Sequence, residues 1–136
     1  MRISNGITVY VAAPFISDPE ANTHNAMAYW NTLMDLGYEP FCPHLYFYMH
    51  QRHPRDEQEW LEHDLVWMHK CDVMLRLPGT SKGADREEAE FEGLIFHSIP
   101  ELEEWRKNPL PGMGQNQDHL QGNPHVLGSG QIGEPR

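Results

Sequence analysis

The stretch that decides the fold is Ile7-Thr8-Val9-Tyr10-Val11-Ala12-Ala13-Pro14, near the start of the 136-residue chain. Its residues are β-branched or apolar at almost every position, without the regular alternation of a strand that has one face in water. Such a run is typical of a strand buried on both faces of a parallel sheet. We therefore expect a central strand here.

Strand-like and helix-like segments alternate after this strand. A turn and helix start at residues 18–22 lead into apolar residues at helical spacing up to Leu36, and Gly37 ends the helix. The next segments predict an edge strand at 38–43, a helix at 56–70, a strand at 71–77, a helix from about 84, a strand at 93–97 and a helix at 100–107. This order predicts an α/β fold with a single doubly wound parallel sheet, in a flavodoxin/Rossmann-like three-layer α/β/α arrangement.

The composition divides the chain into a domain at 1–107 and a Gly/Pro-rich tail at 108–136. Six of the 11 glycines and four of the 11 prolines fall in the tail, without periodicity. No apolar stretch approaches the roughly 18 residues of a membrane-spanning helix, and no signal-peptide pattern follows Met1. We therefore expect a cytoplasmic protein without a membrane partner.

The charge of the chain limits its partners. Ten Lys and Arg against 20 Asp and Glu give a formal net charge of -10, which repels a nucleic acid polymer. A single small phosphate is still compatible, because a few oriented N–H groups and hydroxyls suffice to bind one. Cys42 and Cys71 lack the spacing of a disulfide framework, so we expect buried thiols.

The loops after the predicted strands are where an open α/β sheet binds its ligand. The third of them, Leu77-Pro78-Gly79-Thr80-Ser81-Lys82-Gly83-Ala84-Asp85-Arg86-Glu87, is a strand-to-helix turn that would present backbone N–H groups and a hydroxyl to an anion. A purely structural interpretation is equally open, with Ser81 as a helix N-cap and Glu87 as a surface acid.

Asp64 is the second unusual carboxylate, because it lies within the apolar stripe of the helix at 56–70. Either it faces the pocket or it bonds a backbone group of a neighbouring element. Asp72, at a helix-to-strand junction, is expected to be structural.

Three blocks together resemble the nucleoside 2-deoxyribosyltransferase superfamily: Val9-Tyr10-Val11-Ala12-Ala13-Pro14-Phe15, then Asp64 with Cys71-Asp72-Val73-Met74-Leu75, then Ser81-x-Gly-x-x-x-Glu87. The resemblance covers roughly residues 7–103. It implies that Glu87 attacks C1' of a nucleoside sugar, that Asp64 binds the sugar and moves protons at the leaving base, and that Tyr10 orients the nucleophile. It further implies that Gly83 lets the backbone approach the sugar.

Ser81 carries the prediction of the substrate. Transferases of this superfamily that act on free nucleosides are similar in having an aspartate six positions before the glutamate, whereas monophosphate hydrolases have a serine. An aspartate would repel a phosphate dianion, and a serine hydroxyl can donate to it. The resemblance therefore implies an N-glycosidase that hydrolyses a nucleoside or deoxynucleoside 5'-monophosphate without a cofactor. The remaining substrate-binding candidates are Ala12, Pro14, Phe15, Asn22, Asn25, His44, Lys82 and Gly83.

Several alternatives stay open at this point. The chain could exchange bases between free nucleosides, or bind a nucleotide as a sensor without turnover. His44 could face the ligand or bond to backbone. Nine histidines are present, but no set has recognised metal-ligand spacing, so no metal is expected. The run Tyr46-Phe47-Tyr48-Met49 could cover a base, or it could belong to the core or to a subunit interface. The resemblance implies a homodimer or a higher homo-oligomer.

Overall fold

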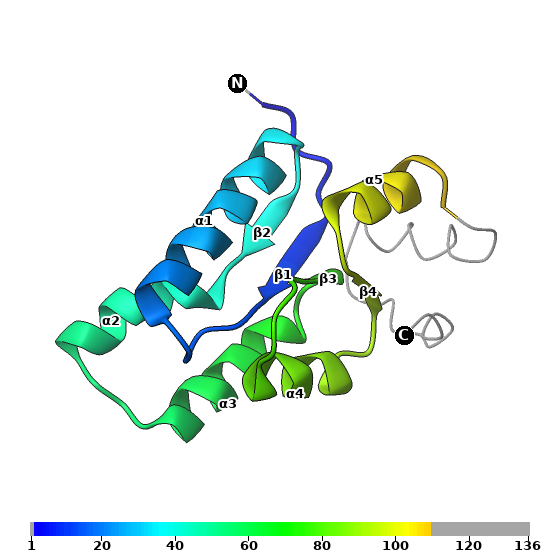
Figure 1. Ribbon diagram of the computed structural model, residues 1–136. Coiled ribbons are helices and arrows are strands. Elements are labelled where there is room, and N and C mark those ends of the chain that lie inside the picture. The colour runs from blue at the N-terminus through cyan, green and yellow to red at the C-terminus, as the bar shows by residue number, and fades with distance from the viewer. Residues whose placement is uncertain (1, 110–136) are drawn as a thin grey trace.

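The computed structural model describes residues 2–109, which form a sheet of four strands with five α-helices (Figure 1). The predicted tail therefore lies outside the described residues from residue 110 onward. The elements are, in order, β1 Thr8–Ala12, α1 Pro19–Asp35, β2 Glu39–Phe41, a 3-10 turn Pro43–Leu45, α2 Tyr46–Arg52, α3 Glu57–Met68, β3 Val73–Arg76, α4 Lys82–Glu90, β4 Leu94–Phe96 and α5 Ile99–Lys107.

The sheet is parallel throughout, in the strand order β2-β1-β3-β4. Tyr10 of β1 lies opposite Phe41 of β2 on one side and opposite Met74 of β3 on the other. The predictions of a central first strand and of an α/β fold with a parallel sheet are confirmed.

Alternate residues of β1 are buried on opposite faces of the sheet. Val9 and Val11 pack in one apolar cluster with Leu33 of α1 and Trp105 of α5. The other cluster contains Tyr10, Ala12, Met68 of α3 and Ala84 of α4. Burial of each large apolar side chain contributes about 1.5–3 kcal/mol, which explains why no polar position interrupts this strand.

Polar side chains define where the helices begin. Asp18, Asp56, Ser81 and Ser98 each accept a hydrogen bond from a backbone N–H in the first turn of α1, α3, α4 and α5. The cap on Asp18 starts α1 at Pro19, a few residues before the periodic apolar pattern becomes visible. The helix α2 was not predicted, because its aromatic and polar residues have no helical periodicity and none of them is fully buried.

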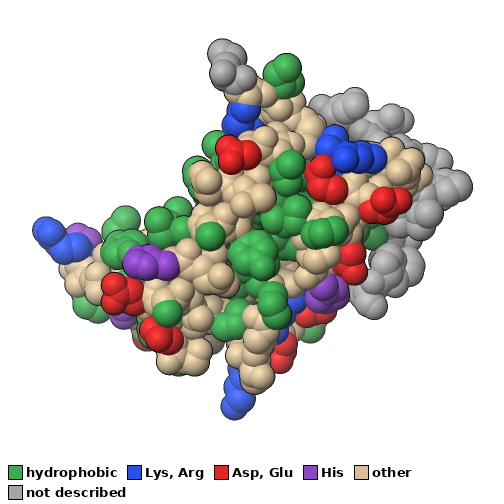
Figure 2. Space-filling model, turned by 45° about the horizontal axis from the view of Figure 1, so that its top comes forward, with side chains coloured by type: hydrophobic (Ala, Val, Ile, Leu, Met, Phe, Trp, Pro, Cys, Tyr) green, Lys and Arg blue, Asp and Glu red, His purple; other side chains and the backbone are tan. Residues whose placement is uncertain are grey.

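The surface carries both apolar and charged side chains, as the composition leads one to expect. On the face that Figure 2 shows, apolar side chains gather in the middle, and many of the Lys and Arg side chains lie beside acidic ones. Within residues 2–109, no helix combines the length and the apolar character that a membrane span requires. Cys42 is buried as expected, whereas Cys71 is only partly buried.

Candidate functional site

The centre of the candidate site is a buried hydrogen bond between Tyr10 and Glu87. The Tyr10 hydroxyl donates to Glu87 Oε2 at 2.7 Å, and the two residues are 77 positions apart in sequence. Tyr10 has no exposed surface and Glu87 is 7% exposed. A carboxylate at such depth needs a partner, and the central strand supplies it.

The local sequence of α4 explains why Glu87 points inward. Ala84 and Glu87 are the buried residues of this helix, and they lie one turn apart on the face toward Tyr10. Ser81 begins the helix by accepting a hydrogen bond from the Ala84 N–H at 3.0 Å. The expectation that Ser81 caps a helix is therefore confirmed, and the interpretation of Glu87 as a surface acid is wrong because α4 buries it.

Burial changes the protonation of both partners. It raises the pKa of Glu87 from 4.5 to about 7, although the hydrogen bond from Tyr10 and the positive charge of Arg76 act in the opposite direction. The pKa of Tyr10 is raised well above its usual value, first by burial and then by the charge of Glu87. Tyr10 is therefore a hydrogen-bond donor at every physiological pH, and Glu87 is close to its midpoint at neutral pH.

Asp64, on α3, is the third member of the cluster. Burial, and after it the charge of Glu87, raise the pKa of Asp64 from 3.8 to about 8. Its Oδ1 atom is buried and has no hydrogen-bond partner among residues 2–109. The raised pKa therefore favours the protonated form of Asp64 at neutral pH. Two neighbouring carboxyls that both titrate near neutral pH are an arrangement that acid and nucleophile roles can use.

An aromatic stack extends from this cluster toward the surface. The Tyr10 ring stacks on Phe41 with centroids 5.9 Å apart, and Phe41 stacks on Trp67 at 5.8 Å. Tyr46 contacts Phe41 at 6.3 Å and stacks on Trp60 at 5.2 Å. Tyr46, which was expected near a base, in the core or at an interface, thus belongs to an aromatic wall beside the cluster. We use this name for the side chains of Phe41, Tyr46, Trp60 and Trp67. The sequence analysis did not single out Phe41 and Trp67.

The first two loops at the carboxyl edge of the sheet are joined through His44. Its Nε2 atom contacts the Pro14 carbonyl oxygen at 2.8 Å, and its ring lies edge-on to Phe15 at 5.5 Å. His44 is only 5% exposed, and burial lowers its pKa despite the opposing effect of nearby backbone carbonyls. Because a carbonyl only accepts, the neutral ring donates from Nε2. The structure thus favours the backbone-bonded alternative for His44.

The third loop touches the first at Gly79. This residue has a φ of +120°, and a Cβ atom added to it would lie 2.7 Å from Pro14 Cγ. A side chain at position 79 would therefore meet both an unfavourable backbone conformation and a steric clash with Pro14. Gly83 is different, since an added Cβ would meet only Ser81 Oγ at 4.0 Å. The space above Gly83 is therefore open, as an approaching ligand would need.

The remaining candidates have diverse surroundings. Ala12 has no exposed surface, and its carbonyl accepts from the Leu77 N–H at 2.8 Å, so its side chain offers nothing to a substrate. Asn22 donates to the Phe15 carbonyl and to Ser17 Oγ, both at 3.1 Å, and so braces the first loop. Asn25 and Lys82 are exposed, on α1 and at the start of α4. Asp72 accepts from the Thr8 N–H at 2.9 Å, so its structural role is confirmed.

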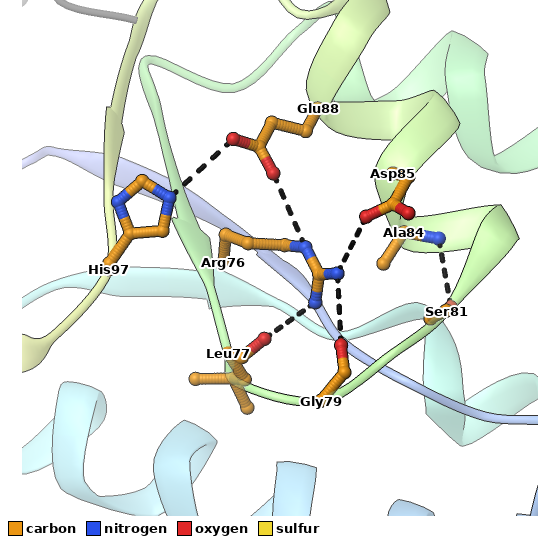
Figure 3. Close-up of polar contacts among 8 residues, drawn as sticks. All are labelled: Arg76, Leu77, Gly79, Ser81, Ala84, Asp85, Glu88 and His97. Carbon is orange, nitrogen blue, oxygen red and sulfur yellow. Dashed lines mark hydrogen bonds and ion pairs between the residues drawn. The ribbon is translucent and has the colours of Figure 1, made fainter.

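Arg76 was missed by the sequence analysis. It ends β3, is 8% exposed, and forms ion pairs with two acidic side chains of α4 (Figure 3). An arginine inside the apolar run Val73–Leu77 was the available signal, because a buried cation requires partners. A cavity of about 270 Å³ lies against it, lined by Arg76, Leu77, Pro78, Gly79, Glu88 and His97. Tyr10, Asp64 and Glu87 do not line this cavity.

The histidines do not form a metal centre in the part of the chain that the structure describes. Across residues 2–109, no group of three or more His, Cys, Asp or Glu side chains is placed to hold a metal ion. His50 accepts from the Trp60 indole N–H at 2.8 Å, and His63 contacts the Tyr46 hydroxyl at 3.0 Å. These two histidines support the aromatic wall.

Comparison with known proteins gives one match. Residues 7–95 match the model of a family described as a domain of unknown function (DUF7768). No curated protein and no solved structure matches the chain significantly. The matched range runs from the residue before β1 into β4, and it includes Tyr10, Asp64 and Glu87.

Proposed function

The chain belongs to the DUF7768 family, to which no function is assigned, and we propose from the chemistry of its site that it is an N-glycosidase. It hydrolyses the N-glycosidic bond of a nucleoside or deoxynucleoside 5'-monophosphate, giving free base and ribose or deoxyribose 5-phosphate. One observation carries the proposal: the buried Glu87, bonded to Tyr10, and the partly buried Asp64 form one cluster in which burial raises the pKa of both carboxyls toward neutral pH.

The first step breaks the bond to the base. A Glu87 carboxylate oxygen attacks C1', and the C1'–N bond breaks as its electron pair moves to the base. The Asp64 carboxyl donates its proton to the base, which leaves as a neutral molecule. Tyr10 keeps the attacking carboxylate in place by donating to its other oxygen. The product is an ester between Glu87 and the sugar.

The second step restores the enzyme. Asp64, now ionised, accepts a proton from a water molecule, and the water oxygen attacks C1'. The ester bond breaks, and its electron pair returns to Glu87 as a carboxylate. The proton gained by Asp64 serves the next turnover. Each carboxyl therefore begins and ends a cycle in the same protonation state.

The start of α4 supports a monophosphate substrate. The Ser81 oxygen accepts from the helix, which leaves its O–H free to donate to a phosphate oxygen. Lys82 is exposed beside it, and the first N–H groups of a helix favour an anion. Because Arg76 is already paired, these groups rather than an arginine hold the phosphate in our proposal.

We also propose a doubly wound, flavodoxin/Rossmann-like three-layer arrangement and a homodimer. The two apolar clusters on opposite faces of the sheet support the layers.

Exposed apolar side chains on α2 and α3 support the dimer, among them Tyr48 at 45%, Met49 at 51% and Trp67 at 42% exposure. Light scattering at several concentrations tests the dimer, and a mass equal to one chain throughout would exclude it.

The proposed activity is tested by incubation with a panel of ribonucleoside and deoxyribonucleoside monophosphates, with free base measured by chromatography. We expect release from at least one of them, a loss of at least about 1,000-fold in Glu87→Gln, and no loss in Glu90→Gln, whose side chain pairs with Arg86 on the same helix. Base release that needs a second base would indicate transfer. Tight binding of an intact nucleotide would indicate a sensor, and either result would overturn the proposal.

A further inference from the structure

One guanidinium joins the end of β3, the loop that follows it and the helix α4. Arg76 donates from Nη1 to the Leu77 carbonyl at 2.5 Å and from Nη2 to the Gly79 carbonyl at 3.1 Å. Its Nη2 atom is also 2.9 Å from Asp85 Oδ1, and its Nε atom is 3.3 Å from Glu88 Oε1. Figure 3 shows these four partners around the guanidinium.

The partners belong to two different parts of the structure. The two carbonyls belong to the turn between β3 and α4, and the two carboxylates belong to α4 itself. The planar fork of an arginine carries five N–H donors in fixed directions, so one side chain can hold all four partners. The side chain of Arg76 is 9% exposed, whereas that of Asp85 is 67% exposed and that of Glu88 34%, so water competes least for the two carbonyl contacts and most for Asp85. The turn and the helix are consequently fixed relative to one strand.

The position of the carboxylates on α4 connects them to the candidate site. Asp85 directly follows Ala84, and Glu88 directly follows Glu87, so the two acids form a flank beside the buried face of the helix. Two contacts one turn apart along one flank resist rotation of the helix about its axis. Rotation would move Glu87 away from Tyr10, to which it is bonded at 2.7 Å.

The positive charge of Arg76 also acts on the Glu87 carboxyl, whose pKa it lowers against the effect of burial. The other titratable groups facing Glu87 are Tyr10 from β1 and Asp64 from α3, and their pKa values are raised in part by Glu87. Arg76 is thus the cation that favours the ionised nucleophile. The Nε2 atom of His97 also lies 3.5 Å from Glu88 Oε2, and this contact is an ion pair only when the imidazole carries a proton.

We propose that Arg76 is a positioning residue, which locks the rotation of α4 through Asp85 and Glu88 and thereby aims the Glu87 carboxylate at Tyr10. The consequence for catalysis rests on the proposed N-glycosidase function. The consequence for the placement of Glu87 does not, and it is measurable without any substrate.

Three variants separate the two contributions of Arg76. Arg76→Lys keeps the positive charge and removes the fork. Arg76→Met removes the charge and keeps most of the stem. Asp85→Ala combined with Glu88→Ala leaves Arg76 and its carbonyl contacts in place and removes the anchors on the helix. Arg86→Met is the matched control, because it removes an exposed ion pair, with Glu90, from the same helix.

The placement of Glu87 is followed by NMR, with 13C-labelled glutamate to titrate its carboxyl and with contacts between the Tyr10 ring and the Glu87 side chain. We expect Glu87 to titrate at a higher pH in Arg76→Met than in the wild type. In Arg76→Lys the titration should stay near that of the wild type while the contact to Tyr10 weakens. The Asp85 and Glu88 double variant should weaken the same contact, and Arg86→Met should change neither.

Base release is the second readout. We expect kcat to fall by about 10- to 100-fold in Arg76→Lys and in the double variant, with KM changed by less than about 3-fold, since the nucleophile is displaced and the substrate contacts are kept. Wild-type protein without base release would refute the proposed function and leave the NMR test standing. An unchanged Tyr10 contact in the folded double variant would overturn the positioning role, and unchanged titration in folded Arg76→Met would refute the charge effect.

Discussion

Replacing Glu87 by Gln is expected to stabilise the protein above neutral pH. Burial raises the pKa of Glu87 from 4.5 to about 7, so between these values the folded chain binds more protons than the unfolded chain. The free energy of unfolding therefore falls as the pH rises through this range. The stability that the protonated carboxyl contributes is complete below about pH 4.5 and is lost above about pH 7.

The size of the effect follows from the same shift. The difference between 4.5 and about 7 corresponds to roughly 3 kcal/mol at about 1.36 kcal/mol per pKa unit. Glutamine has the shape of the protonated carboxyl, is neutral at every pH, and can accept the Tyr10 O–H through its carbonyl oxygen. We expect Glu87→Gln to exceed the wild type by roughly 3 kcal/mol at pH 8.5 and to equal it within about 0.5 kcal/mol at pH 4.5.

The assay is urea unfolding followed by circular dichroism at both pH values. Glu90→Gln is the control on the same helix, since Glu90 is partly exposed and pairs with Arg86, and its effect should stay within about 0.5 kcal/mol at both pH values. The reasoning is refuted if Glu87→Gln is no more stable than the wild type at pH 8.5. A difference of equal size at both pH values would refute it as well, because it could not come from ionisation.

Three further predictions concern the loops and the acid. Ser81→Asp still caps α4, so the fold should persist, whereas kcat/KM for monophosphates should fall at least about 10-fold relative to free nucleosides, measured by base release. Gly79→Ala should lower the free energy of unfolding by about 1–3 kcal/mol, because φ at this position is +120° and the new Cβ meets Pro14. Gly83→Ala should not be destabilising, since a Cβ has room there, and thermal unfolding measures both variants. Asp64→Asn should slow base release by about 100- to 10,000-fold, but much less with a 7-methylated purine nucleotide, whose cationic base leaves without a proton; an equal loss on both substrates would contradict the acid role.

The elements with a clear apolar pattern could be predicted from the sequence, and those held by side-chain contacts could not. Segment 7–14 could be predicted as a central strand because burial on both faces leaves no charged position and few polar ones. The helix α2 was missed because Tyr46 is held by stacking on Trp60, at a ring distance of 5.2 Å, and by an edge-on contact with Phe41 at 6.3 Å, and not by a periodic apolar stripe. Such contacts depend on where α3 and β2 lie, which no local pattern contains.

The residues of the site also divide into those that the sequence could indicate and those that depend on contacts between distant elements. Glu87 and Asp64 could be chosen from the sequence by their residue types and by a family resemblance, and the structure brings them into one buried cluster with Tyr10. The need for glycine at position 79 became visible only when Pro14 was found against it. Arg76 was missed although it is a cation in an apolar strand, because its acidic partners lie further along the chain, on a helix whose rotation the sequence does not specify.

The electrostatics of the cluster link its stability to its chemistry. Burying Glu87 and Asp64 together costs free energy whenever both are ionised, and the raised pKa values of about 7 and about 8 are the expression of this cost. An apolar residue at either position would remove the cost and pack against the same aromatic wall. A chain that keeps two carboxyls there gives up stability, and the positive charge of Arg76 lowers the pKa of Glu87 against the effect of burial. In the reaction that we propose, this charge favours an ionised nucleophile beside a protonated acid.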